Sequence, residues 1–164
     1  MKILGVTFRN NLSATPHVEE IIGACSGSLH ALRILRSHGL SREALNVVAE
    51  ATTISRLLYA APAWGGGYVT AADRQRLERL LLSKTARLGY ICEGGATMEM
   101  RVGLTEDRLL KAIEGNRDHV LRRLFPSPIQ PKYAHGFELP CKDDKHFIPR
   151  VLYKLTIIQA NNKI

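Results

Sequence analysis

The stretch YAAPAWGGGYVTAAD, residues 59–73, interrupts an otherwise helical pattern and sets where the neighbouring helices end and begin. Pro62 lacks the amide hydrogen that a helix interior needs, and the three glycines at 65–67 favour a turn. Thr70 and Asp73 then have the spacing of a capping box, which marks the first turn of a new helix. We therefore expect one helix to end near this stretch and another to begin at its far side.

Helical periodicity extends upstream of this break. Apolar positions predict a helix over 18–35, with Ser13 or Thr15 at its start and Gly39 just past its end. A second helix, capped by Ser41, is expected to continue to residue 59.

Helical periodicity also extends downstream. Leucines at 77, 80, 81 and 88 form one apolar stripe of the helix that begins at residue 70. After a hinge or loop at 93–95, the pattern predicts a short helix that ends at Gly103 and a longer helix, capped by Thr105, that continues to residue 124.

The two ends of the chain differ from this helical middle. At the start, Leu4, Val6 and Phe8 share one face of an alternating run, which predicts one buried strand whose partners lie outside this chain. After residue 125, prolines at 126, 128, 131 and 140 predict an extended, irregular segment. The run HFIPRVLYKLTII, residues 146–158, fits either a strand or a short helix. The fold class is therefore mainly α, with one N-terminal β-strand and an irregular proline-rich C-terminal segment.

Composition narrows the function to a few classes. The 164 residues carry a net charge of +8 and have a sequence pI of about 9.7, which favours polyanionic partners such as nucleic acid. Three widely spaced cysteines predict neither a disulfide framework nor a Cys-x-x-Cys zinc site. A secretory signal and a membrane-length apolar run are not visible in the sequence. We expect an intracellular protein, in the nucleus or the cytoplasm, without membrane association.

Motifs of common enzymes are not visible in the sequence. It holds no GxSxG, no phosphate-binding GxxxxGK[ST], no GxGxxG and no HExxH. Asp143 and Asp144 are adjacent acids, but they lie between lysines in the proline-rich region, so we interpret them as a solvated turn. Cys141 and His146 supply only half of a zinc knuckle. No catalytic residue, cofactor or metal is predicted.

Arginines at helical spacing are the main candidate for binding. Guanidinium groups repeated along a helix can follow successive phosphates, although a charged run is more often only a solvated face. The candidate nucleic-acid-binding residues are Arg76, Arg79, Lys84, Arg87, Arg33 and Arg36. Trp64, the single tryptophan, either stacks on a base or fills a gap in the core, and the second interpretation is preferred.

Several blocks, taken in order, resemble one family. They are ILGVTFRNNLSATPHVEEI (3–21), LHALRILRSHGLSREAL (29–45), LLYAAPAWGGGYVTAADRQRLERLLLSKTARLGY (57–90), HVLRRLFPS (119–127) and FELPCKDDKHFIPRVLYK (137–154). Together they resemble the region after the catalytic palm in reverse transcriptases of non-LTR (LINE-type) retrotransposons, jockey-like elements of arthropods among them. The block at 57–90 is the most specific, and Ala14 departs from the aromatic residue usual at its position.

The resemblance implies a helical, thumb-like bundle that contacts primer–template duplex through its backbone without sequence preference. Residues 1–92 would hold the end of a palm strand and the thumb-like helices, 93–125 further helices, and 126–164 the extended segment. The family's paired polymerase aspartates have no match here, so the resemblance implies a fragment of an RNA-directed DNA polymerase that does not polymerise by itself. Its partners would be RNA or DNA duplex and the missing palm and fingers.

Other interpretations stay open at this point. The chain is alternatively a helical interaction protein that recruits a partner through its exposed N-terminal strand edge. It is also compatible with a small basic nucleic-acid-binding protein unrelated to retroelements, and with a gene model cut from a longer reading frame. Binding to a partner strand would tolerate salt, whereas binding to duplex would weaken steeply with salt.

Overall fold

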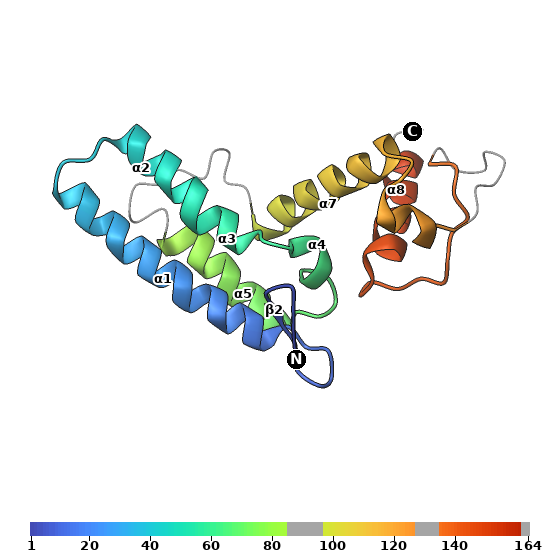
Figure 1. Ribbon diagram of the computed structural model, residues 1–164, viewed down its shortest axis with the longest axis horizontal. Coiled ribbons are helices and arrows are strands. Elements are labelled where there is room, and N and C mark those ends of the chain that lie inside the picture. Colours follow the sequence, from blue (N-terminus) through green and yellow to red (C-terminus); the bar gives the residue numbers. More distant parts are fainter. Residues whose placement is uncertain (85–96, 127–134, 162–164) are drawn as a thin grey trace. The chain divides into compact units, whose positions relative to one another are not determined.

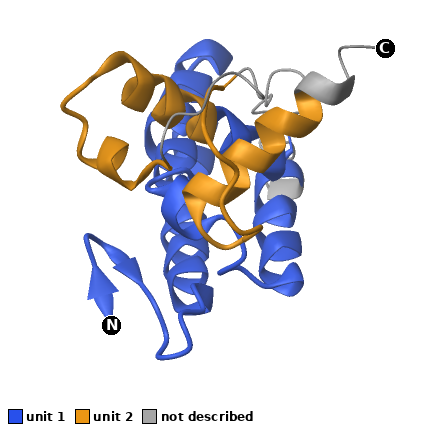
Figure 2. Cartoon of the chain, turned by 90° about the vertical axis from the view of Figure 1, so that its right-hand side faces the viewer, with its two compact units in different colours: residues 1–104 blue, residues 105–164 orange. Residues whose placement is uncertain are grey.

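A computed structural model describes residues 1–84, 97–126 and 135–161 of the chain. The described residues are mainly helical with strand structure at the N-terminus, as the sequence predicted, and that strand structure is a short two-stranded sheet. The chain separates into two compact units, Met1–Leu104 and Thr105–Ile164, and Figure 2 colours them separately.

The N-terminal sheet is a hairpin. β1 (Lys2–Ile3) pairs antiparallel with β2 (Val6–Thr7), and the turn between them uses positive φ angles, 45° at Leu4 and 85° at Gly5. The expectation of one strand with its partners outside the chain is therefore wrong. Gly5 adopts positive φ readily, so the run that reads as one strand reverses there and pairs with itself.

The first long helices end and begin where the sequence predicted. α1 (Thr15–Ser37) is followed by Gly39, which has a φ of 86°. The Leu40 amide donates to the Leu35 carbonyl, 3.1 Å away, which is a Schellman closure of α1. Ser41 then caps the next helix by accepting from the Ala44 amide.

That second helix continues to residue 57 through one altered turn. It comprises α2 (Arg42–Ala49), a π-helical turn η1 (Glu50–Ile54) and α3 (Ser55–Leu57). Figure 1 shows α1 and the α2–α3 helix side by side, and contacts between α1 and each of α2, η1 and α3 agree with this view.

Trp64 lies in the core, as the preferred interpretation expected. Ala60 takes a left-handed φ of 51° and turns the chain into α4 (Ala61–Trp64). The indole is 0% exposed, and its Nε1 donates to the Tyr59 carbonyl at 2.7 Å. Thr70 caps α5 (Ala71–Arg79), which continues as the π-helical η2 (Leu80–Lys84).

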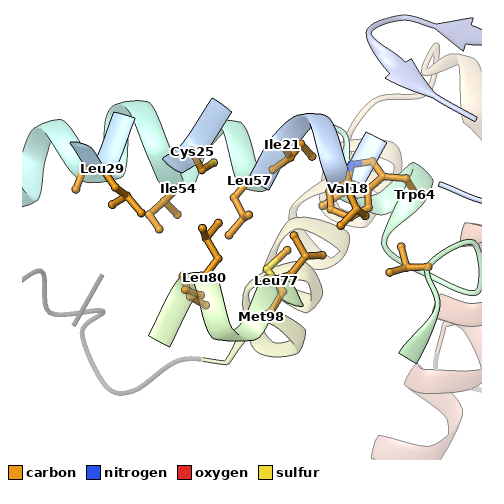
Figure 3. Packing of buried hydrophobic residues seen from close by; sticks show 14 of the residues in the cluster. Val18, Ile21, Cys25, Leu29, Ile54, Leu57, Trp64, Leu77, Leu80 and Met98 are labelled. Atoms are coloured by element: carbon orange, nitrogen blue, oxygen red, sulfur yellow. The ribbon is translucent and has the colours of Figure 1, made fainter. Parts of the chain in front are cut away.

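The core of unit 1 lies between these helices. Figure 3 shows apolar side chains of α1, the α2–α3 helix and α5 pointing into a common interior. The labelled residues are Val18, Ile21, Cys25, Leu29, Ile54, Leu57, Trp64, Leu77, Leu80 and Met98. This packing fixes which faces of α1 and α5 are turned toward solvent.

One uninterrupted helix, α7 (Met98–Gly115), replaces the two helices predicted around Gly103. A glycine in a helix interior costs only about 1 kcal/mol, so Gly103 does not end the helix and Thr105 does not cap a new one. The predicted continuation to residue 124 is also wrong, because α7 ends at Gly115 and Val120–Leu124 form a separate 3-10 turn, η4.

Unit 2 packs a second helix against its part of α7. α8 (Phe147–Asn161) contains the run that fits either a strand or a helix, and its first turn accommodates Pro149. The described residues from 135 to 146 are largely irregular, as predicted. Four buried apolar residues form the centre of the unit: Leu110, Ile113, Val151 and Leu152.

Candidate nucleic-acid interface

The six predicted binding residues do not form one cluster. Arg33 and Arg36 are exposed near the C-terminal end of α1, and Arg79 is exposed at the end of α5. Lys84 is the last residue of η2, and Arg87 lies outside the described residues.

Arg76 is held by acidic side chains. Its guanidinium lies 3.2 Å from the Asp73 carboxylate and 3.9 Å from that of Glu19 on α1. Two nearby carboxylates compensate much of its charge. Arg76 is therefore a link between α5 and α1 more than a free cation for phosphate.

Asp73 accepts the hydrogen bonds that connect α5 to α1 in this region. It is buried and accepts hydrogen bonds from the hydroxyls of Thr15, at 2.7 Å, and Thr70, at 2.8 Å. Burial alone would raise the pKa of Asp73, but the bonds from Thr15, Thr70 and Arg76 together lower it below its ordinary value. Asp73, which the sequence predicted to form a capping box with Thr70, thus also joins the start of α5 to the start of α1.

Arg33 and Arg79 are differently placed. Among the described residues, neither makes an ion pair or a hydrogen bond, and both side chains are exposed. Arg33 is 14 residues beyond Glu19, the partner of Arg76, which corresponds to about 21 Å along α1. Arg33 and the Arg76–Glu19 pair therefore lie well apart along α1.

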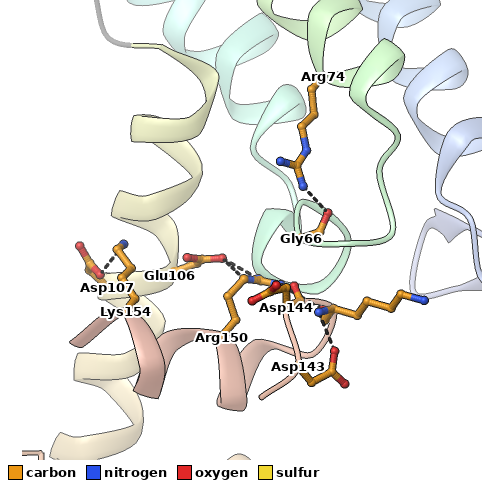
Figure 4. A network of polar contacts seen from close by, with 9 residues as sticks. Gly66, Arg74, Glu106, Asp107, Asp143, Asp144, Arg150 and Lys154 are labelled. Carbon is orange, nitrogen blue, oxygen red and sulfur yellow. Dashed lines mark hydrogen bonds and ion pairs between the residues drawn. The ribbon is translucent and has the colours of Figure 1, made fainter. Parts of the chain in front are cut away.

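Several other arginines of unit 1 are occupied by the fold. Arg74 donates to the Gly66 carbonyl at 3.1 Å, which holds the glycine-rich turn against α5 (Figure 4). Arg56 donates to the Ser28 hydroxyl at 3.3 Å, and Arg101 pairs with Glu50 at 3.3 Å. The contacts of Arg56 and Arg101 join segments far apart in the sequence, so no local pattern identified these two roles.

Unit 2 also uses arginines to hold its own helices. Arg122 donates to the Ile113 and Glu114 carbonyls, at 3.2 and 3.0 Å, and so caps the C-terminal end of α7. Arg150 on α8 donates from Nε to Glu106 on α7 at 3.0 Å (Figure 4). These two positions are structural.

Net charge does not single out either unit. Residues 1–104 contain 12 basic and 8 acidic residues, and residues 105–164 contain 11 and 7, so each unit carries +4. Among the six predicted binding residues, Arg33 and Arg79 combine an exposed side chain with the absence of an ion pair to the described residues.

The acidic and metal-ligating candidates give no second site. Asp143 accepts from the Lys145 amide at 2.8 Å and contacts the His146 ring, so it closes the turn before α8. These two bonds lower the pKa of Asp143, and the bond with His146 has the larger effect. In the parts of the chain that the structure describes, no three His, Cys, Asp or Glu residues converge to hold a metal ion.

Comparisons with protein-family models, with curated proteins and with solved structures found no match for this chain. Within the described residues, no helix combines the length and the apolar character needed to cross a bilayer.

Proposed function

We propose that this chain is the thumb and C-terminal region of a non-LTR retrotransposon reverse transcriptase, and that it holds primer–template duplex by its phosphate backbone. Two observations support the proposal. The block at 57–90 resembles that family, and exposed arginines lie on the outer sides of helices whose inner sides form the core. Arginine contacts with phosphates bind without reading sequence, as a duplex-holding element requires.

The binding assignment rests on one observation: the side chains of Arg33 and Arg79 are exposed and make no ion pair with the described residues. A guanidinium already paired with carboxylate must lose that interaction before it contacts phosphate, and Arg76 is in this position. Arg33 and Arg79 have no such partner among the described residues. Of the predicted binding residues, Arg33 and Arg79 are therefore better candidates for phosphate contact than Arg76.

The proposed activity is binding and not synthesis. In the family that this chain resembles, the paired aspartates of polymerisation lie upstream of the stretch that residues 3–8 resemble, so the palm and fingers of a parent polymerase would supply the chemistry. The chain's contribution would be to keep the duplex in place while another part of the enzyme extends it.

Salt-dependent binding of the full chain to a short DNA duplex and to an RNA–DNA hybrid tests this proposal. Replacing Arg33 and Arg79 together by alanine is expected to lower affinity for both duplexes and to reduce the slope of log K against log salt by about 2. The control replaces Arg108 and Lys111, two exposed residues of α7, and so removes the same charge from unit 2.

The control separates local contact from net charge. If both double variants lose affinity equally, net charge explains the binding and the assignment to Arg33 and Arg79 is wrong. If the wild-type chain binds neither duplex at low salt, the proposed function itself is wrong. Circular dichroism of each variant checks that helicity is unchanged.

A further inference from the structure

The N-terminal hairpin is firmly attached along one of its strands. Val6 of β2 is 3% exposed, and Phe8 packs edge-on against Tyr68 with ring centroids 6.0 Å apart. The Thr7 hydroxyl donates to Glu20 of α1 at 3.1 Å. β2 is therefore the inner strand of the hairpin, and its position is fixed by side chains on both of its faces.

The turn of the hairpin is also attached. The Tyr59 hydroxyl donates to the Leu4 carbonyl at 3.0 Å, and the ring of Tyr59 lies against Gly5. The hairpin is consequently an ordered feature of the fold, and what its outer strand exposes is held in place.

Apolar side chains of the outer strand and the turn are left uncovered. Ile3, directly opposite the buried Val6, is 47% exposed, and Leu4 is 87% exposed. Figure 2 shows the first strand on the outer side of the hairpin, away from the helices of unit 1. β2 is thus packed against the rest of unit 1, whereas the apolar side chains of β1 and of the turn are exposed to solvent.

Leucine is conformationally unfavourable at position 4, in the turn between β1 and β2. Its φ of 45° lies in the left-handed region, which costs a residue with a β-carbon about 1 kcal/mol and which Asn, Asp and Gly tolerate better. A leucine there gains little from packing, because the side chain is almost fully exposed. Neither conformation nor burial within the described residues accounts for this leucine.

The backbone of β1 has one free edge. Met1 and Phe8 exchange hydrogen bonds of 2.8 and 2.9 Å, and Ile3 pairs with Val6, so the peptide groups of Met1 and Ile3 point toward β2. Because neighbouring residues of a strand alternate, the amide and carbonyl of Lys2 point outward. No hydrogen bond joins them to another described residue.

We propose that the edge of β1 accepts a β-strand from a different protein, one that carries an acidic residue opposite Lys2 between apolar residues. Main-chain hydrogen bonds to Lys2 would hold the added strand, and Ile3 and Leu4 would cover its apolar side chains. Lys2 is exposed and makes no ion pair with the described residues, so an acid complements it.

A second copy of this chain fits the edge less well. Antiparallel pairing of two β1 edges about their outward-facing residue would bring Lys2 opposite Lys2. Like charges directly opposite each other destabilise a strand pair. Charge therefore favours a different, acidic strand.

The test uses a blocked peptide of sequence Thr-Val-Glu-Val-Thr and a second peptide with Lys in place of Glu. Nuclear magnetic resonance of the full chain, without nucleic acid, follows the amide of Lys2 during titration. The Glu peptide is expected to shift that amide and slow its exchange, and the Lys peptide is expected to bind about fivefold more weakly. Lys2→Glu should reverse the preference.

Leu4→Asn separates recruitment from folding. Since Asn suits the turn better, the variant is expected to fold at least as stably as the wild type and yet bind the Glu peptide more weakly. Val47→Asn removes a similarly exposed apolar side chain from α2 and should change neither property. Equal binding of both peptides, a lack of binding to the wild type, or concentration-dependent self-association through β1 would each overturn the proposal. The duplex assay does not enter this test, so failure here leaves the proposed nucleic-acid binding intact.

Discussion

The two units of this chain are stabilised by different kinds of interaction. Among the described residues, unit 1 buries 18 apolar side chains around α1 and α5, whereas unit 2 buries four. Burial of a large apolar side chain contributes about 1.5–3 kcal/mol, so unit 1 has much the larger apolar contribution.

Unit 2 compensates with polar tethers. Arg150 binds Glu106 and also donates to the carbonyls of Asp144 and Lys145, at 3.2 and 3.0 Å. Lys154, one turn further along α8, reaches Asp107 at 3.5 Å. α8 is therefore positioned by charged contacts with α7 as much as by its four-residue apolar centre. We therefore expect core cavities to lower the stability of unit 1 most, and the loss of a charged partner to lower the stability of unit 2 most.

The largest effect is expected from Trp64→Ala. Removing a fully buried indole leaves a cavity and orphans the Tyr59 carbonyl, which should reduce the free energy of unfolding of unit 1 by about 3–5 kcal/mol. Chemical denaturation followed by circular dichroism measures this loss. Hydrogen exchange should locate it in residues 1–84.

Trp64→Phe is the matched control, because it keeps most of the apolar volume and loses the hydrogen bond. A smaller loss than that of the alanine variant is expected. If Trp64→Ala leaves stability unchanged but weakens duplex binding, the indole stacks on a base. The stability of unit 1 would then not depend on burial of this side chain.

A slightly smaller effect, confined to unit 2, is expected from Arg150→Ala. This change leaves the buried Glu106 carboxylate without its cation, which should cost about 3 kcal/mol. Hydrogen exchange of α8 should accelerate, while exchange in α1 should stay the same.

The double variant Glu106→Leu with Arg150→Met sharpens this prediction. It removes both charges and keeps apolar volume, so most of the lost protection should return. Persistent loss in the double variant would show that the bonds from Arg150 to the carbonyls of Asp144 and Lys145, and not the ion pair, position α8.

Local signals in the sequence predicted the elements that local chemistry controls. Ser41, Thr70 and Gly39 mark helix ends because each acts on backbone groups within four residues of itself. The mainly helical class and the buried Trp64 follow from periodicity and from the aromatic residue's position after a helix. These features were confirmed.

Two features were not predictable in this way. The alternation of residues 1–8 is the same for one strand and for a hairpin, and the difference rests on the conformation of Leu4 and Gly5. The helical pattern of arginines likewise does not show that Asp73 and Glu19 compensate Arg76, because Glu19 lies on another helix. The sequence thus identified candidate binding residues, but it could not show which of them lack an ion pair in the folded chain.

The smallest effect is expected at His17, which is an exception to the apolar character of unit 1. Its ring is 4% exposed and lies edge-on to Trp64, 5.3 Å between centroids, and neither ring nitrogen has a hydrogen-bond partner among the described residues. Burial lowers the pKa of His17, nearby Glu20 opposes this, and Lys2 adds to it. Protonation would place an unpaired charge in the core.

The consequence is a loss of stability in mild acid. Because the folded-state pKa lies below the unfolded value of about 6.5, the unfolded chain binds the proton first, and stability falls as pH drops from about 6.5 toward the folded pKa, by at most about 1.4 kcal/mol per pH unit. His17→Phe should reduce this slope in denaturation experiments, and the remaining slope should come from His135, whose pKa burial also lowers. Asp73 does not interfere, since its own loss begins only below about pH 3.9. An unchanged slope in the variant would mean that the His17 ring finds a partner when protonated, and that unit 1, like unit 2, tolerates buried charge.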